Sequence, residues 1–156
     1  MGRSRSAERF LREADRLGLS LRVREFPEGT RTAEDAARAI GCAVGQIVKS
    51  LVFVAGTEPF LALTSGPNRA DVARLTDLVG RPVRRADAEE ARNATGFSIG
   101  GTPPFGHPRR LRVFLDRDLL AFDEVWAAAG TPSSVFPMAP GDLITAAGAE
   151  PAEFKE

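Results

Sequence analysis

Apolar side chains recur every three or four positions in several segments of the chain, and this spacing predicts amphipathic helices. The predicted helices are 7–17, 33–40, 69–79, 87–95 and 140–147. In the third of these, Val72, Leu75 and Leu78 form the apolar face. Residues that commonly begin or end helices flank the segments, such as Thr32 before the second helix and Gly41 after it.

Shorter apolar or alternating stretches predict strands. The predicted strands are 21–26, 47–54, 59–64, 111–115 and 134–138. Segment 47–54 is β-branched and apolar on both faces, so we expect a central strand, with 59–64 paired back on it as a hairpin. Pro137 should keep the last strand near a sheet edge. Residues 123–129 are expected to form a short helix or turn that ends at Gly130.

The order of these elements predicts a single α+β domain with a mixed sheet. The chain has 156 residues, which is the size of one domain. We find no internal repeat or linker, and we expect the domain to span 7–150 with short tails at 1–6 and 151–156. No apolar run reaches the roughly 20 residues needed to span a membrane, and the N-terminus lacks the apolar stretch of a secretory signal. We therefore expect a cytoplasmic protein with no membrane partner.

Cys42 and His107 are the only cysteine and the only histidine. One thiol forms no internal disulfide, and these two residues are too few for a zinc site. Since no loop gathers carboxylates, we expect neither a metal nor another cofactor. Cys42 is expected to be a small buried hydrophobe, and the absence of a Gly-x-Ser-x-Gly motif argues against a serine hydrolase.

The formal net charge is zero, but the charges are unevenly placed along the chain. Residues 1–115 carry 19 Lys+Arg and 13 Asp+Glu, whereas residues 116–156 carry 2 and 8. This asymmetry fits a basic face for a polyanion, and equally two halves that attract each other. The arginines that could meet an RNA backbone are Arg81, Arg84, Arg85, Arg109, Arg110 and Arg112, and a solvated surface is the alternative interpretation.

Lys49 is the most informative single residue. Lysine occurs only at positions 49 and 155, while every other basic residue is arginine. Lys49 also lies inside the predicted central strand, where an unpaired ammonium is costly to bury. A compact point charge at this place could bind a phosphate or a polar substrate group. The alternative is a lysine whose stem packs in the fold while its head reaches solvent.

The segment Gly100-Gly-Thr-Pro-Pro104 is the second candidate for chemistry. Adjacent glycines allow positive φ and a close approach of a ligand, and the following prolines stiffen the loop. Successive N–H groups in such a turn could bind an anion or polarise an ester carbonyl. An ordinary surface loop is the alternative.

Together the two motifs resemble the YbaK/EbsC family, the free-standing relatives of the editing domain inserted in bacterial prolyl-tRNA synthetases. The matching residues are Ile47-Val-Lys49-Ser50-Leu51 and the Gly-x-x-x-Pro motif from Gly100 to Pro104, within a resemblance that covers roughly 7–147. It implies a compact α+β fold with helices around a mixed, barrel-like sheet. It also implies hydrolysis of mischarged tRNA, often prolyl-tRNA carrying a small amino acid.

The resemblance assigns roles to particular residues. Lys49 would hold the terminal nucleotide of the tRNA, and the backbone of Gly100, Gly101 and Thr102 would bind the ester carbonyl. The expected substrate contacts are Ser50, Pro103, Pro104 and His107; a surface hydrogen bond is the alternative role of His107. Cysteine-specific members carry an aspartate in their last strand, but residues 133–136 contain no acid, so cysteine specificity is not expected.

Two other functions remain open at the level of sequence. One is a binding module without catalysis that holds an aminoacyl end or a nucleotide, or that partners a synthetase. The other is a hydrolase of small acyl esters, which the zero net charge makes harder to dismiss. The partner expected first is the 3′ end of a mischarged tRNA, with a synthetase as a second candidate and no DNA. The amino acid and the tRNA are not specified by the sequence.

Overall fold

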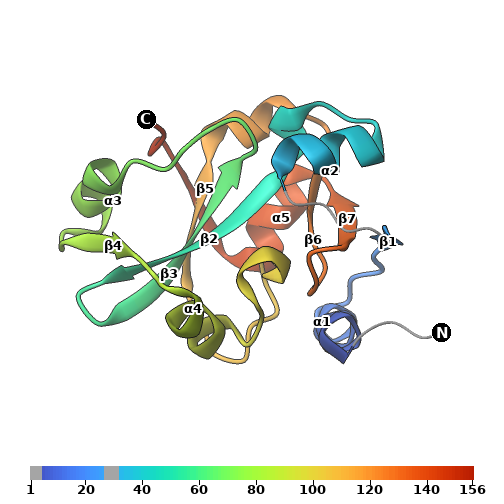
Figure 1. Cartoon of the computed structure of the whole chain (residues 1–156), viewed down its shortest axis with the longest axis horizontal. Coiled ribbons are helices and arrows are strands. Elements are labelled where there is room, and N and C mark those ends of the chain that lie inside the picture. Colours follow the sequence, from blue (N-terminus) through green and yellow to red (C-terminus); the bar gives the residue numbers. More distant parts are fainter. Residues whose placement is uncertain (1–4, 27–31) are drawn as a thin grey trace.

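The computed structural model describes residues 5–26 and 32–156, which form two β-sheets with helices around them (Figure 1). The helices are α1 (Arg5–Arg16), α2 (Ala33–Ile40), α3 (Val72–Val79), α4 (Ala88–Thr95) and α5 (Pro140–Ala147). Short 3-10 helices are η1 (Val44–Gln46), η2 (Ile99–Gly101) and η3 (Arg117–Ala121). The strands are β1 (Arg24–Glu25), β2 (Val48–Ala55), β3 (Glu58–Ser65), β4 (Val83–Arg85), β5 (Arg112–Asp116), β6 (Val125–Ala128), β7 (Ser134–Met138) and β8 (Ala149–Ala152).

The larger sheet has the strand order β4-β2-β3-β5-β8 and is mixed, as predicted. β2 and β3 form the expected antiparallel hairpin, while β5 runs parallel to both β3 and β8. β4 pairs only with Phe53–Ala55 of β2. In the described part of the chain, the first half of β2 therefore has no strand ladder on this side, and this open edge lies at the candidate site.

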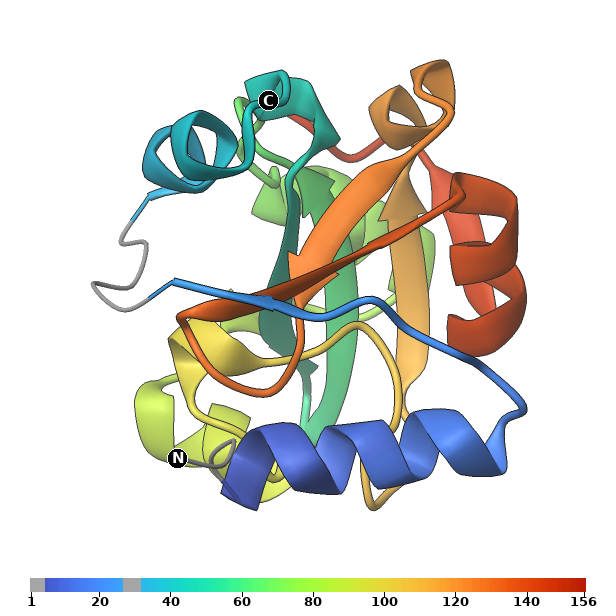
Figure 2. The ribbon, with the colours of Figure 1, turned by 90° about the vertical axis from the view of Figure 1, so that its right-hand side faces the viewer.

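The smaller sheet has the order β1-β7-β6 and is antiparallel. A single bridge between Ile47 and Trp126 joins it to the start of β2. The two sheets do not close into a barrel, so the expected barrel-like description holds only loosely. Figure 2 shows α1 lying across one end of the molecule, beneath the loop that carries η2.

The alternation of side chains on β2 explains why its sequence is apolar throughout. Val52 and Val54 join the main core, which fills the space between the sheets and includes Phe10 and Phe136. Phe53 and Ala55 point the other way into a second core, with the fully buried residues Leu75 and Phe154. β2 is buried on both faces, which confirms the predicted central strand.

Local signals placed most helices correctly. Thr32 caps α2 by accepting a hydrogen bond from the Asp35 amide, and Gly41 ends the helix with a φ of 87°. The face expected on α3 is only partly right. Leu75 is fully buried and Val79 is partly buried against the second core, whereas Val72 and Leu78 are 41% and 38% exposed.

The segment 123–129 does not form the expected helix or turn, because Val125–Ala128 is strand β6. Its pairing with β7 outweighs the helical tendency of its alanines. β7 lies in the middle of its sheet and not at an edge. Pro137 is nevertheless tolerated, because β1 pairs only with Ser134 and Val135 and leaves the outer side of Pro137 without a ladder.

Strands β4 and β8 were not predicted, and β1 is shorter than the expected 21–26. Residues 151–156, expected to be a tail, continue the fold. β8 extends to Ala152, Phe154 is fully buried, and Lys155 forms a bridge with Ala70. At the other end, α1 already begins at Arg5.

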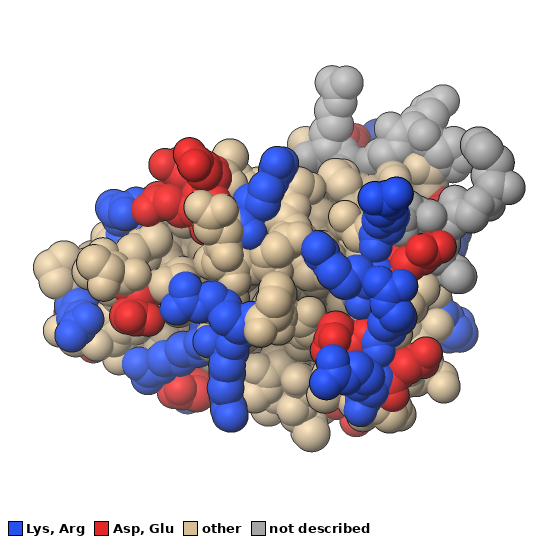
Figure 3. Space-filling model, turned by 90° about the horizontal axis from the view of Figure 1, so that it is seen from below, with Lys and Arg blue, Asp and Glu red and all other residues tan. Residues whose placement is uncertain are grey.

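Surface charges are grouped. Seen from below, Lys and Arg side chains gather in separate clusters, one of them a column over α1 (Figure 3). Three of the ion pairs join residues 1–115 to residues 116–156: Arg22–Glu124, Arg69–Glu156 and Arg112–Glu150. Within 5–26 and 32–156, we find no helix that is long and apolar enough to cross a membrane.

Candidate active site

Lys49 lies at the second position of β2, at the open edge of the larger sheet. Its side chain is half-buried, and its Nζ donates a hydrogen bond to the main-chain oxygen of Asn68. No ion pair to a carboxylate is formed by Lys49 within the described residues. A carbonyl orients the ammonium without neutralising it, so the positive charge remains available to a ligand.

The surroundings disfavour the charged form of Lys49. Burial is the main cause and lowers the pKa of Lys49 below the ordinary lysine value of 10.5. Glu34 raises this pKa, while Arg85 and Arg69 lower it further. A lysine with a lowered pKa in a hollow is typical of functional sites.

Asn68 is held by a hydrogen-bond network, with Asp116 as its buried member, that the sequence did not reveal. Its Nδ2 donates to Asp116 Oδ2 and to Asp118 Oδ2, both at 2.8 Å. Asp116 is 3% exposed and also accepts the Ser65 amide at 3.0 Å. Asp118 in turn accepts a hydrogen bond from Lys155 at 2.8 Å. The two lysines of the protein therefore lie at the two ends of one chain of contacts.

A pocket of about 250 Å³ opens beside Lys49. Consecutive residues 47–51 line one side of it, which is the open edge of β2. The other walls come from α2, from η2 and its neighbours, and from β6 and β7. Lys49, Ser50, Gly100 and Thr102 all line this pocket, so the structure brings together four of the predicted site residues. Most other lining residues are apolar, and none is acidic.

Ser50 contributes a hydroxyl that has no partner in the described structure. Its Oγ is buried without a hydrogen bond. Ser50 also borders a second cavity of about 10 Å³, together with Thr102 and Arg85. That volume is close to the minimum needed for one water molecule. The small cavity beside Ser50 therefore has room for one water molecule that could pair with the buried hydroxyl.

The glycines of the Gly100–Pro104 loop serve close packing and not positive φ, which neither of them adopts. A Cβ added at Gly101 would lie 2.6 Å from Thr131 Cα, and one at Gly100 would lie 3.3 Å from Pro132 Cγ. The Gly101 amide already donates to the Ser98 carbonyl at 3.0 Å, so it is not available to an ester carbonyl. Gly100 and Thr102, which line the pocket, are the loop residues placed to contact a ligand.

The remaining predicted residues lie away from Lys49. Pro103 is buried and lines neither hollow, and its carbonyl is 2.7 Å from His107 Nε2. Since a carbonyl can only accept, Nε2 of His107 carries a proton. His107 is half-buried, packs edge-on against Phe97, and has its pKa lowered below 6.5 mainly by burial. The structure gives His107 a structural hydrogen bond inside the loop.

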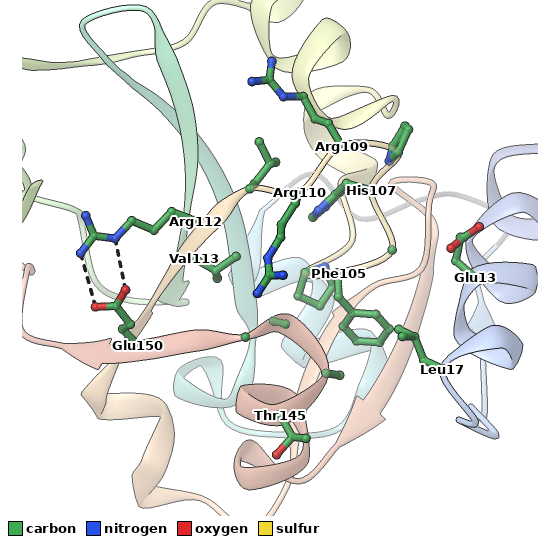
Figure 4. A pocket seen from close by; sticks show the side chains of 17 residues that line it. Glu13, Leu17, Phe105, His107, Arg109, Arg110, Arg112, Val113, Thr145 and Glu150 are labelled. Atoms are coloured by element: carbon green, nitrogen blue, oxygen red, sulfur yellow. Dashed lines mark hydrogen bonds and ion pairs between the residues drawn. The ribbon is translucent and has the colours of Figure 1, made fainter.

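Pro104 and His107 line a second, larger hollow of about 920 Å³ (Figure 4). It lies between α1, α5 and the segment that leads into β5. Arg112 on its wall is paired with Glu150 at 3.1 Å, and Arg109 with Glu58 at 3.6 Å. Arg110 also lines this hollow and forms no ion pair among the described residues (Figure 4). Two of its three arginines are thus compensated. The smaller pocket is the better candidate because it brings together Lys49, Ser50, Gly100 and Thr102, whereas the larger hollow contains only Pro104 and His107 of the predicted residues.

The described residues contain no group of three or more His, Cys, Asp or Glu side chains that could hold a metal. Cys42 is half-buried among apolar neighbours of the α2 region, and burial raises the pKa of its thiol above 9.0. A protonated thiol is a poor nucleophile. The polar side chains that line the smaller pocket are those of Thr32, Lys49, Ser50 and Thr102.

Comparison with known proteins gives consistent matches. A family model described as the aminoacyl-tRNA editing domain matches residues 27–146. The uncharacterised protein YwhH of Bacillus subtilis (strain 168) is 33% identical over 122 residues, which are 78% of either chain. The proline–tRNA ligase of Nitratidesulfovibrio vulgaris (strain DP4) is 33% identical over 92 residues, which are 58% of this chain and 16% of the ligase.

Solved structures agree with the sequence matches. The crystal structure of a candidate trans-editing enzyme for prolyl-tRNA synthetase superposes with a TM-score of 0.95 at 49% identity, covering 99% of both chains. That of a hypothetical protein, APE2540, gives a TM-score of 0.87 at 29% identity, covering 95% of this chain and 99% of the other.

Proposed function

Because the chain belongs to the aminoacyl-tRNA editing family, among the YbaK-like relatives of the prolyl-tRNA synthetase editing domain, we propose that it is a deacylase. It hydrolyses the aminoacyl ester of mischarged tRNA as a free-standing editing enzyme. The observation that supports this most is the small pocket at the open edge of β2, where the Lys49 ammonium has no acidic partner among the described residues.

Lys49 binds the negatively charged or polar groups of the 3′-terminal nucleotide. The aminoacyl group lies in the pocket against Ile47, Trp126 and Val135, with its ester near Ser50 and Gly100. Water attacks the ester carbonyl, the bond between the carbonyl carbon and the ribose oxygen breaks, and the ribose oxygen takes a proton. The products are the free amino acid and the uncharged tRNA. An aminoacyl ester is already reactive, so orientation and carbonyl polarisation are sufficient.

The proposed substrate is a small amino acid on tRNA-Pro or a related tRNA. A pocket of about 250 Å³ must hold the aminoacyl group and part of the terminal ribose, which favours small side chains. An apolar pocket separates side chains that differ by one methylene by only about 1–3 kcal/mol. Discrimination by exclusion of the larger residue is therefore more effective than discrimination by affinity. The absence of an acid in the pocket supports a substrate other than cysteine.

The test is deacylation of prolyl-tRNA carrying alanine, cysteine, serine or proline, and of alanyl-tRNA carrying serine. We expect rapid loss of one small aminoacyl group from tRNA-Pro. Lys49→Ala should lower kcat/KM about 10- to 150-fold, which corresponds to the roughly 1.5–3 kcal/mol of a charged hydrogen bond. Arg74→Ala, which removes an exposed charge from α3, is the matched control and should retain activity.

Three outcomes would contradict the proposal in whole or in part. If no charged tRNA in the panel loses its amino acid, the protein is better described as a binding module. If Lys49→Ala deacylates as fast as the native protein, the protein is a deacylase but its active site does not depend on Lys49. Faster hydrolysis of a small acyl ester than of any charged tRNA would favour a different substrate class.

A further inference from the structure

α1 carries arginine at positions 5, 9, 12 and 16. The spacings of four, three and four residues place these side chains on one face of the helix. The buried residues Ala7, Phe10 and Ala14 form the opposite face, which packs on the main core. All four arginines are exposed. We call them the α1 arginine stripe, and the column of basic side chains over α1 is visible in Figure 3.

The stripe is only partly neutralised. Glu8 and Asp15 occur at helical spacings that allow ion pairs, but neither forms one in the described structure. Arg16 pairs with Glu13 at 2.9 Å. Arg5 and Arg12 have no hydrogen bond or ion pair within 5–26 and 32–156, so their guanidinium groups are free to bind a ligand.

Arg9 ties the stripe to the glycine–proline loop. Its guanidinium donates to the Gly96 carbonyl and lies 4.3 Å from the centre of the Phe97 ring. These contacts fix the middle of the stripe next to the segment that leads into η2. Neighbouring side chains on the stripe are about 5–6 Å apart at their Cβ atoms, as on any helix face.

The start of α1 is joined to the candidate pocket through residues 130–132. A Cβ added at Gly130 would lie 2.7 Å from the Ser6 carbonyl oxygen, so the two backbones are in contact. Thr131 packs directly on Gly101, and Pro132 lines the pocket together with Gly100. Figure 2 shows α1 running from this region along the end of the molecule. The helix that carries the stripe therefore begins next to a segment that lines the pocket.

We propose that the α1 arginine stripe binds the phosphate backbone of the RNA whose 3′ end occupies the Lys49 pocket. This inference rests on the proposed function and names a contact surface for its substrate. An RNA held by its terminal nucleotide must continue over the surface next to the pocket. Arginine binds phosphate with two parallel N–H donors, and a row of arginines along a helix is the electrostatic footprint of a nucleic-acid backbone.

The test measures binding of uncharged proline-accepting tRNA by fluorescence anisotropy at several salt concentrations. The variant is Arg5→Gln/Arg12→Gln, since glutamine keeps helix propensity and neither arginine has a partner to lose. The control is Arg38→Gln/Arg74→Gln, which also removes two exposed helix charges, each with one ion pair within its own helix. Circular dichroism should show the same helix content in all three proteins.

We expect the stripe variant to bind tRNA more weakly and its plot of log K against log salt to be shallower by about 1 per arginine. The control should keep the native slope. Deacylation should show a raised KM for full-length charged tRNA and unchanged hydrolysis of a short 3′-terminal aminoacyl oligonucleotide that does not reach α1.

A native slope in the stripe variant would overturn the inference, whether or not the protein deacylates tRNA. Equal loss in the control would also overturn it, because the effect would then be one of net charge. Stripe-dependent binding to anionic phosphatidylserine vesicles without binding to tRNA would assign the stripe to a membrane surface instead. A shallower salt dependence of tRNA binding in the stripe variant, with no deacylation by the native protein, would support the proposed RNA contact and contradict only the proposed catalysis.

Discussion

At the scale of single residues, the notable feature of Lys49 is its hydrogen-bond partner. Its Nζ donates to a main-chain carbonyl and not to a carboxylate, so the side chain is oriented while its charge is retained. A neighbouring acid would compete with a phosphate for the same ammonium. Without a carboxylate partner to offset it, burial lowers the pKa of Lys49 and disfavours its charged form. An arginine, with its planar fork, would not place a point charge in the same way.

Gly101 is required by close packing, and its replacement offers a sharp test. In Gly101→Ala the new methyl would lie 2.6 Å from Thr131 Cα, so the loop or the 130–132 segment must move. We expect a loss of about 1–3 kcal/mol in the free energy of unfolding, measured by urea titration, together with reduced deacylation.

Gly141→Ala is the matched control for this substitution. Gly141 lies in the first turn of α5 with nothing within 4 Å of the added methyl. Alanine there should be neutral or stabilise by up to about 1 kcal/mol. Equal stability of the two variants would show that the Gly101–Thr131 contact is not restrictive.

At the scale of elements, the loop between β3 and α3 carries the carbonyl that holds Lys49. Its conformation is set from both sides. Asp116 at the end of β5 and Asp118 in η3 bind the Asn68 side chain. The segment after β8 binds the same loop, because the Asp71 amide donates to the Phe154 carbonyl and the Glu156 amide to the Arg69 carbonyl. Three elements distant in sequence therefore position one lysine.

Asn68→Ala tests whether this loop positions Lys49. It removes two hydrogen bonds and leaves the main-chain carbonyl, so we expect a loss of about 1–3 kcal/mol in stability and a lower kcat/KM. In the Lys49→Ala background the same substitution should reduce stability again but should not reduce kcat/KM further. Equal reductions of kcat/KM in both backgrounds would show that Asn68 acts independently of Lys49.

At the scale of the whole molecule, pH should affect stability through the only histidine. His107 has a pKa below 6.5 in the folded state because burial disfavours its charged form. As pH falls through 6.5, the unfolded chain takes up a proton that the folded chain does not. Stability is therefore complete above pH 7.5 and decreases toward pH 5.5, by at most about 1.4 kcal/mol per pH unit for one proton.

His107→Gln isolates this contribution. Glutamine can still donate to the Pro103 carbonyl but does not titrate, so its free energy of unfolding should be flat over the same range. The shifted carboxylate Glu90, with a pKa of about 2, stays ionised throughout this window. The same decrease in both proteins would mean that another group titrates.

The sequence predicted the parts of the molecule that local pattern determines. The helices and the strands at 47–54, 59–64 and 111–115 have long periodic runs, and Lys49, Ser50, Gly100 and Thr102 do line one pocket. The prediction from sequence failed where pairing with a neighbouring strand determines the secondary structure. β6 is a strand only because β7 lies beside it, and β4 and β8 are too short to give a pattern.

The same limit applies to the site. Asn68 and Asp116 are 48 residues apart, and nothing in either neighbourhood indicates that they meet. A polar residue closing the buried strand at 111–115 was the only available signal. Pro104 was placed at the site as the last residue of the Gly-x-x-x-Pro motif, and His107 because it follows that loop. In the structure both residues line the larger hollow and not the pocket beside Lys49.

The open edge of β2 limits how far the pocket could be redesigned. An uncovered strand edge is a template for pairing with another chain. Beyond the bridge from Ile47 to Trp126, residues 48–51 have no strand ladder on one side among the described residues, and they lie at the base of a narrow pocket. Trp126 and residues Ala33 and Ala36 of α2 line the same pocket. Enlarging the pocket for bulkier amino acids, for example through Trp126→Ala, would also expose that edge to other molecules. We therefore expect substitutions at Trp126 to change both the volume of the pocket and the exposure of this strand edge.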